Sequence, residues 1–229
     1  MTWVELQTSF KVGMNKVDTQ YSKSYEPEEI DLFLNQAQEK IIKTRFESQN
    51  NFRIKAFEGS QKRIDDLRVL VKRASLVPTT TANVNEYTVT LPTDYLFYIS
   101  SVGKIECGST FIPGGSGSTD TNIVEIYNAA HADFNRMKKD PFNKPDYKRL
   151  LIEFETNKIY LYGEAGFFPI KYDLTYLRYP VKITGTGTVT SELPTHIHQE
   201  IINESIAIAV ENAQDPRYQT VLNELNKQE

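Results

Sequence analysis

The two histidines His196 and His198 form the pair in this sequence that comes nearest to a metal site. They occur as His-Ile-His at the start of a predicted helix, where residues two apart point about 200° away from each other. Zinc-binding histidines on a helix are instead four residues apart. With His131 as the only other histidine, the chain cannot supply a three-histidine site, and a mixed site with carboxylates would leave no recognisable signature. We therefore expect no metal and no cofactor.

The sequence also lacks the pattern of a catalytic nucleophile. Its single cysteine, Cys107, falls among apolar neighbours in a predicted strand, and no Gly-x-Ser-x-Gly elbow occurs. The stretch FIPGGSGSTDT, residues 111–121, lacks the Gly-Lys-Ser/Thr ending and the strand-to-helix setting of a phosphate-binding loop. Carboxylates such as Glu28 and Asp65 fall on predicted helix starts or exposed faces. We expect the protein not to be an enzyme.

Aromatic residues are concentrated in the predicted strands. The positions are Tyr95, Phe97, Tyr98, Tyr160, Tyr162, Phe167, Phe168, Tyr172, Tyr176 and Tyr179. Platforms for single-stranded nucleic acid also combine strands with rings, but they interleave lysine and arginine, which are few here. We expect these rings in the core and at subunit interfaces. A single-stranded nucleic-acid or glycan binding module built on the tyrosine-rich strands is the alternative.

The charge is unevenly distributed. Residues 190–229 carry two basic and seven acidic side chains, within a chain of net charge −4. Proteins that read a DNA sequence normally present a basic face, so this end argues against that class, although not against passive contact with DNA in a channel. There is no run of about 18 apolar residues and no secretion signal, so we expect no membrane contact. One cysteine excludes an internal disulfide and points to a reducing cytosolic origin.

Residues 26–48 carry the strongest periodic signal in the chain. Apolar residues recur at intervals of three and four, as on an amphipathic helix. They are Ile30, Phe33, Leu34, Ala37, Ile41 and Ile42. Pro27 fits the first helical position, and acidic residues precede basic ones, as the helix dipole favours. The polar residues between the apolar ones, Asp31 among them, are expected to face solvent, so removing the Asp31 carboxylate should cost little stability.

The middle of the chain is rich in alternating segments typical of strands. The clearest are residues 87–92, 95–107, 150–154, 158–162 and 170–179, with a shorter one at 123–127. Residues 150–154 and 158–162 form a predicted hairpin, and residues 194–212 a long closing helix. We predict an α+β fold in which the N- and C-terminal helices pack together and carry a mostly antiparallel β-rich middle.

The predicted organisation is a single domain, residues 1–229. Its parts are an N-terminal arm (1–24), a helical part (25–77), a β-rich part (78–192) with a flexible loop (113–121), and C-terminal helices (193–229).

Some of the predicted apolar surface exceeds what one compact core uses. The closing helix carries two adjoining apolar stripes, which is wider than one packing partner needs. The N-terminal arm holds the single tryptophan, although an ordered tail packed on its own core explains it equally well. The candidate subunit-contact residues are Trp3, Phe10, Pro141, Phe142, Ile202 and Ile206.

Several stretches resemble structural proteins of tailed bacteriophages, most closely the ring proteins of the head-to-tail connector in crAss-like phages. They are YTVTLPTDYLFYISSVGKI (87–105), DPFNKPDY (140–147), LTYLRYP (174–180) and LPTHIHQEIINESIAIAVE (193–211). The segment EIDLFLNQAQEKIIKTRF (29–46) is similar to the first long helix of those proteins.

This resemblance implies a passive role. Protomers would assemble into a ring, typically dodecameric, below the portal, and DNA would pass through the lumen. The implied partners are further copies of the chain, the portal protein, adjacent connector or tail rings, and DNA without sequence preference. The implied location is the virion, after synthesis in the bacterial host cytoplasm. The family brings no catalytic residues.

Overall fold

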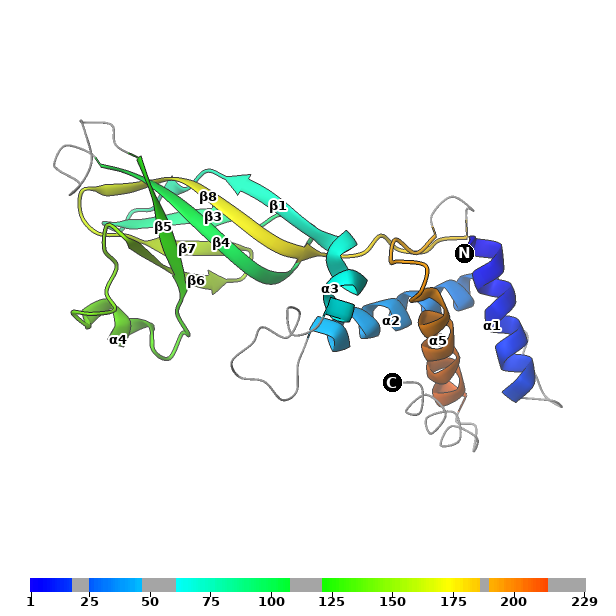
Figure 1. Ribbon diagram of the computed structural model, residues 1–229. Coiled ribbons are helices and arrows are strands. Elements are labelled where there is room, and N and C mark those ends of the chain that lie inside the picture. The colour runs from blue at the N-terminus through cyan, green and yellow to red at the C-terminus, as the bar shows by residue number, and fades with distance from the viewer. Residues whose placement is uncertain (18–24, 47–60, 108–120, 186–189, 214–229) are drawn as a thin grey trace. The chain divides into compact units, whose positions relative to one another are not determined.

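The computed structural model of the chain describes residues 1–17, 25–46, 61–107, 121–185 and 190–213. The chain divides into two compact units (Figure 1). A helical unit comprises Met1–Leu70 and Pro180–Glu229, and a β unit comprises Val71–Tyr179. The predicted α+β class is confirmed, while the single-domain organisation stays a prediction. The glycine-rich stretch 113–120 and the predicted final helix beyond residue 213 lie outside the described residues.

Helix α2 (Pro27–Phe46) is the centre of the helical unit. Its apolar face is the predicted one, because all six periodic residues are buried. Glu28 and Glu29 lie in the first turn and Lys43 and Arg45 in the last, an arrangement that the helix dipole stabilises. The buried stripe therefore determines which side of α2 the other helices cover.

Helices α1 (Trp3–Val17) and α5 (His198–Asn212) cover that stripe. α5 packs against both α2 and α1, so it needs apolar residues on two sides (Figure 1). Ile202 and Ile206 are 1% and 8% exposed. Two partners within the chain explain the wide apolar stripe of α5, and its width no longer indicates a surface left over for another subunit.

One residue on the polar side of α2 does not face solvent as predicted. Asp31 is buried rather than solvent-facing, and its Oδ1 accepts a hydrogen bond of 2.9 Å from Nε1 of Trp3. One turn further on, the Asn35 amide exchanges two hydrogen bonds, of 2.8 and 2.9 Å, with the backbone of Ile183. Helical periodicity treats such residues as solvent-facing, but here they hold α1 and the segment before α5 against α2.

We expect Asp31→Ala to lower the free energy of unfolding by about 1 to 3 kcal/mol, because the Trp3 indole loses its acceptor inside the protein. The matched control is Glu39→Ala on the same helix. Glu39 pairs with Lys43 at 3.4 Å, with both side chains about half exposed, so its loss should cost less than about 0.5 kcal/mol. Urea denaturation compares the two variants, and equal midpoints would contradict a structural role for Asp31.

The β unit contains one sheet of eight described strands in the order β1-β8-β4-β5-β6-β7-β3-β2. The strands are β1 (Val71–Leu76), β2 (Thr79–Thr80), β3 (Glu86–Thr90), β4 (Tyr95–Cys107), β5 (Thr121–Asn128), β6 (Arg149–Glu155), β7 (Lys158–Tyr162) and β8 (Phe167–Arg178). Every neighbouring pair is antiparallel except β5 and β6, which are parallel.

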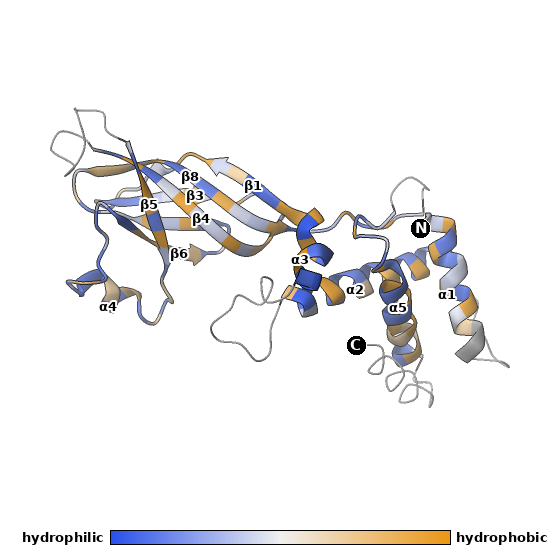
Figure 2. Ribbon diagram, in the orientation of Figure 1, coloured by the Kyte–Doolittle hydropathy of each residue, from blue (hydrophilic) through white to orange (hydrophobic). Residues whose placement is uncertain are grey.

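The core of the β unit lies on the inner face of this sheet. Tyr87 of β3 and Tyr172 of β8 belong to the same buried cluster, although four strands separate β3 from β8 in the sheet order. The sheet must therefore curl around its own core (Figure 1). The alternation of apolar and polar residues that predicted the strands appears as alternating colours along them (Figure 2).

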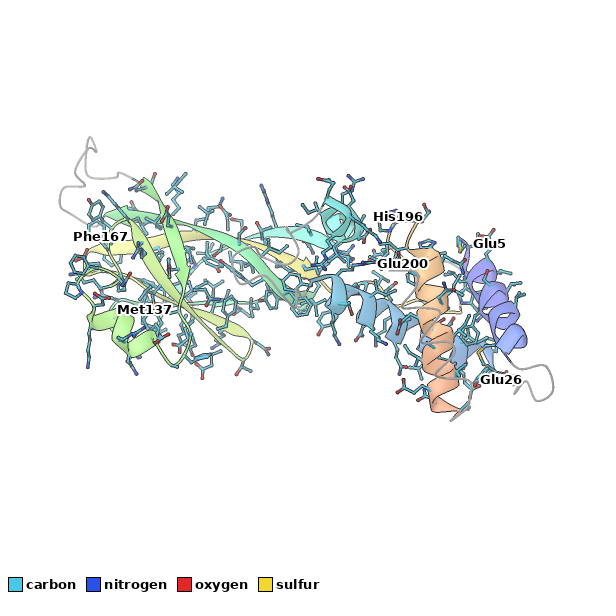
Figure 3. All side chains as sticks on the ribbon, turned by 60° about the horizontal axis from the view of Figure 1, so that its bottom comes forward. Glu5, Glu26, Met137, Phe167, His196 and Glu200 are labelled. Atoms are coloured by element: carbon cyan, nitrogen blue, oxygen red, sulfur yellow. The ribbon has the colours of Figure 1, made fainter. Side chains whose placement is uncertain are left out.

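Helix α4 (Phe134–Lys139) covers the outer face of β6 and β7. The Phe134 ring lies 4.5 Å from the Tyr162 ring, and Nζ of Lys138 lies 4.1 Å from the centre of the same tyrosine. Met137 packs against this second cluster (Figure 3). The lysine thus covers an aromatic pair that would otherwise face water.

Candidate functional site

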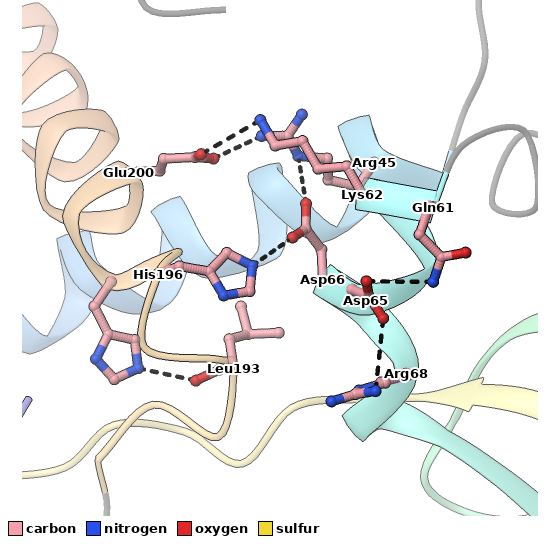
Figure 4. Close-up of polar contacts among 10 residues, drawn as sticks. Arg45, Gln61, Lys62, Asp65, Asp66, Arg68, Leu193, His196 and Glu200 are labelled. Atoms are coloured by element: carbon pink, nitrogen blue, oxygen red, sulfur yellow. Dashed lines mark hydrogen bonds and ion pairs between the residues drawn. The ribbon is translucent and has the colours of Figure 1, made fainter.

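A network of charged side chains joins the end of α2, helix α3 (Gln61–Leu67) and the start of α5 (Figure 4). Nη2 of Arg45 lies 2.6 Å from Glu200, and Nε of Arg45 lies 3.4 Å from Oδ2 of Asp66. The other oxygen of Asp66 lies 2.7 Å from Nε2 of His196. Asp66 is fully buried, so these partners must stabilise its charge. A substrate cannot reach this carboxylate. The network instead holds α2, α3 and the start of α5 together.

The second histidine of the pair has different partners. Nε2 of His198 donates to the backbone carbonyl of Leu193 at 2.9 Å, and the amino group of Met1 lies 3.0 Å from its Nδ1. Burial lowers the pKa of His198 below its usual 6.5. His196 and His198 thus point to separate contacts, as their spacing predicts. His196 and Glu200 both lie beside α3 (Figure 3).

The remaining residues that could do chemistry are dispersed. Across the part of the chain that the structure describes, no three His, Cys, Asp or Glu side chains are grouped so as to hold a metal ion. Cys107 ends strand β4. Nδ1 of His131 lies 2.6 Å from Glu153, with the histidine exposed. Within the same ranges, no helix has both the length and the apolar character needed to cross a bilayer.

Eight of the ten aromatic residues named above are buried or partly buried in the β unit, while Phe168 and Tyr179 are 44% and 48% exposed. Tyr172 and Tyr176 are fully buried, and the Tyr176 hydroxyl donates to Asp94 at 2.7 Å. The Tyr95 ring lies 5.8 Å from Tyr176, and the Tyr98 ring lies 5.3 Å from Phe154. Burial raises the pKa of Tyr95 to about 12. Rings that stack on one another in a core do not form a platform for bases or sugars.

Three of the candidate contact residues lie in the core of their own helical unit. Ile202 and Ile206 are on the covered face of α5, and Phe10 is fully buried. The Phe10 ring lies 6.2 Å from Phe33 and 6.0 Å from Tyr25. Trp3 is held by its bond to Asp31. The N-terminal segment is therefore a helix packed on its own unit, and deleting residues 1–14 would open that core.

Phe142 and Pro141 are the candidate contact residues that lie exposed on the surface of their unit. Its side chain is 90% exposed, and Pro141 beside it is also exposed. Both belong to the turn Asp140–Lys144, which follows α4 and which we call the Phe142 turn. An exposed phenylalanine of this kind can contribute to a binding free energy only when a partner covers its apolar surface.

The Phe142 turn is held in one conformation by its first residue. Oδ1 of Asp140 accepts a hydrogen bond of 3.0 Å from the backbone amide of Phe142, and Oδ2 accepts one of 2.6 Å from the Asn143 side chain. The backbone carbonyl of Asp140 accepts from the amide of Lys144 at 2.9 Å. The bond from Phe142 lowers the pKa of Asp140, so the carboxylate is charged at neutral pH. The turn is thus fixed before any partner binds.

Arg149 connects the Phe142 turn to the outer face of the sheet. It reaches the Phe142 carbonyl at 3.4 Å, and its guanidinium lies 5.2 Å from the centre of the Tyr127 ring on β5. Tyr127 and Ile123 are 50% and 73% exposed and lie on the same face of β5, because residues four apart on a strand point the same way. Apolar side chains therefore continue from the turn onto β5.

Sequence reasoning identified Pro141 and Phe142 but missed the residues that support them. Asp140 could have been identified from the sequence. It directly precedes Pro141, and aspartate commonly stabilises turns through its side chain. Arg149 carried no such signal, since its contact with Tyr127 depends on the parallel pairing of β5 and β6.

The comparison with known proteins agrees with the resemblance found in the sequence. Residues 1–219 match the family of phage tail ring protein 3/4. The chain is also similar to a protein of Bacteroides phage crAss001 named Ring protein 4/5, with 24% identity over 229 residues and 90% of each chain covered. The match extends over both the helical unit and the β unit.

Proposed function

The chain belongs to the phage tail ring protein 3/4 family, and from this membership we propose that it forms a ring in the head-to-tail connector of a crAss-like phage. In this proposal copies of the chain close into a dodecameric ring below the portal. The ring contacts the portal protein and the adjacent connector or tail rings. The protein is made in the host cytoplasm and is present in the virion.

The observation that carries the proposal is the family match over residues 1–219. The contacts of the ionisable side chains also support it. Asp66 and His198 are buried and hold helices together, and the strand tyrosines fill the core of the sheet. These side chains serve packing and cohesion, as a structural subunit requires. Fold alone does not determine function, so the family match carries the greater weight.

The charge distribution is compatible with a passive DNA passage. The chain has 30 acidic and 26 basic residues, and the sequence of the helical unit carries 18 acidic and 14 basic ones. A surface with this balance attracts phosphates weakly, so DNA in the lumen could move without sequence-specific contact. The alternative, a binding module on tyrosine-rich strands, has less support because Tyr172 and Tyr176 are buried.

Quantitative mass spectrometry of purified virions tests this proposal. We expect the chain in a fixed copy number per particle, with a ratio to the portal protein set by the symmetries of the two rings. Virions that lack the chain would contradict the proposal, and so would a purified protein that binds single-stranded nucleic acid or glycan tightly while staying outside the particle.

A further inference from the structure

The Phe142 turn has the features of a preorganised interface anchor. Phe142 is 90% exposed, and Arg149 joins its turn to Tyr127 and Ile123 on β5, which are 50% and 73% exposed. Exposed apolar side chains that lie together mark interaction sites, and aromatic anchors dominate the binding energy of interfaces. The Asp140 hydrogen bonds fix the turn in advance, so binding does not have to order it. These contacts indicate a protein partner that presents an apolar surface.

The surroundings of the turn indicate the charge of that partner. Residues 133–149 contain six basic and three acidic side chains, a net charge of +3 in a chain of net charge −4. Lys139, which precedes the Phe142 turn, and Lys144, which ends it, are both exposed. A partner with an apolar patch and surrounding carboxylates would complement both properties.

The N-terminal half of α2 presents such a surface. Leu32 is 56% exposed on the side of the helix opposite the buried stripe. Glu26, Glu28 and Glu29 precede it within two turns and are all exposed. Their three charges exceed the partial positive charge of a helix start, about half an elementary charge, so this end of α2 is acidic overall.

We propose that the Phe142 turn of one copy packs against Leu32 and the acidic start of α2 in a second copy, an inference that rests on the proposed ring function. The two surfaces are different, one in the β unit and one in the helical unit. A contact between unlike surfaces is heterologous, and such contacts repeat from copy to copy until the rotation closes a ring. A two-fold dimer would instead use one surface against itself.

Crosslinking in purified particles tests this pairing. In a Cys107→Ser background, Phe142→Cys and Leu32→Cys are combined in one chain and treated with a short bismaleimide. We expect a ladder of covalent multimers on a denaturing gel, whereas each single variant stays monomeric. Both positions are exposed, so the substitutions should not impair folding. The matched control combines Leu32→Cys with Val84→Cys, a β-unit position that is 87% exposed, and should give no ladder.

Two crosslinking results would overturn the inference. One is a double variant that remains monomeric in particles that hold several copies of the chain. The other is dimer formation by Phe142→Cys alone, which would indicate a two-fold contact. The copy number is counted separately in particles whose chain keeps Phe142 and Leu32. A single copy or none in those particles would contradict the proposed ring function, so the two failures are distinguishable.

Charge reversal separates a protein partner from DNA. We expect Lys139→Glu with Lys144→Glu to reduce the copies incorporated per particle roughly tenfold. Adding Glu26→Lys and Glu28→Lys to the same chain should restore them, because the attraction is re-formed with opposite signs. Incorporation that is unchanged by the first pair, or that the second pair does not restore, would contradict the pairing.

Discussion

Replacing Ile42 with aspartate should lower the free energy of unfolding by about 3 to 5 kcal/mol, which is the largest loss that we expect from one substitution in the helical unit. Ile42 is fully buried on the apolar face of α2. The substitution removes apolar contacts and places a carboxylate where water cannot solvate it. Chemical denaturation followed by circular dichroism measures the change.

The control is the same substitution on the exposed side of the same helix. Leu32 is 56% exposed, so Leu32→Asp should change the free energy of unfolding by less than about 0.5 kcal/mol. Comparable losses for the two variants would show that the assigned buried face of α2 is wrong.

Arg45→Met should cost about 3 kcal/mol, because it leaves the Asp66 carboxylate buried with one partner fewer. The side chain of Asp66 is 1% exposed and that of Arg45 is 17% exposed, so solvent screens this pair little. His196 retains its contact with Asp66, which keeps the expected loss at the lower end of the range for broken buried pairs. Thermal and urea denaturation measure the effect.

Two further variants isolate the cause. Arg68→Met removes an arginine whose pair with Asp65 is exposed, at 71% and 43%, and should cost less than about 0.5 kcal/mol. Adding Asp66→Leu to Arg45→Met should recover most of the stability, because no buried charge then remains unpaired. If the double variant is less stable than Arg45→Met alone, desolvation of Asp66 is not the cause.

The sequence predicts the regular elements of this protein well, because they depend on short-range periodicity. The apolar stripe of α2 and the alternation along β3, β7 and β8 each reflect which side faces a core. The two prolines at 141 and 145 correctly excluded a helix from that segment. These features need no knowledge of the partner element.

The sequence predicts much less about polar residues in the interior. Asp31 and Asp66 look like ordinary solvent-facing carboxylates, since their burial depends on Trp3 and His196, which lie 28 and 130 residues away. The same limit applies to an apolar helix face that is wider than one packing partner needs. The second apolar stripe of α5 is covered by α1, and the sequence does not show which helix will cover it. Long-range pairing, rather than local pattern, decides both cases.

The same limit applies to the candidate subunit contacts, which stay predictions. Phe10, Ile202 and Ile206 are buried within their own unit, while Phe142 remains exposed on a fixed turn. A residue can serve a neighbouring subunit only if its own chain leaves it uncovered, and that can be read only from a structure.

Cryo-electron microscopy of purified virions tests the central claim most directly. We expect density for this chain in several copies that form a closed ring on the portal axis, with DNA in the lumen and no base-specific contact. The ring should place the Phe142 turn of each copy beside α2 of its neighbour. A reconstruction without this chain, or one that shows it as an isolated monomer bound to nucleic acid, would contradict the assignment.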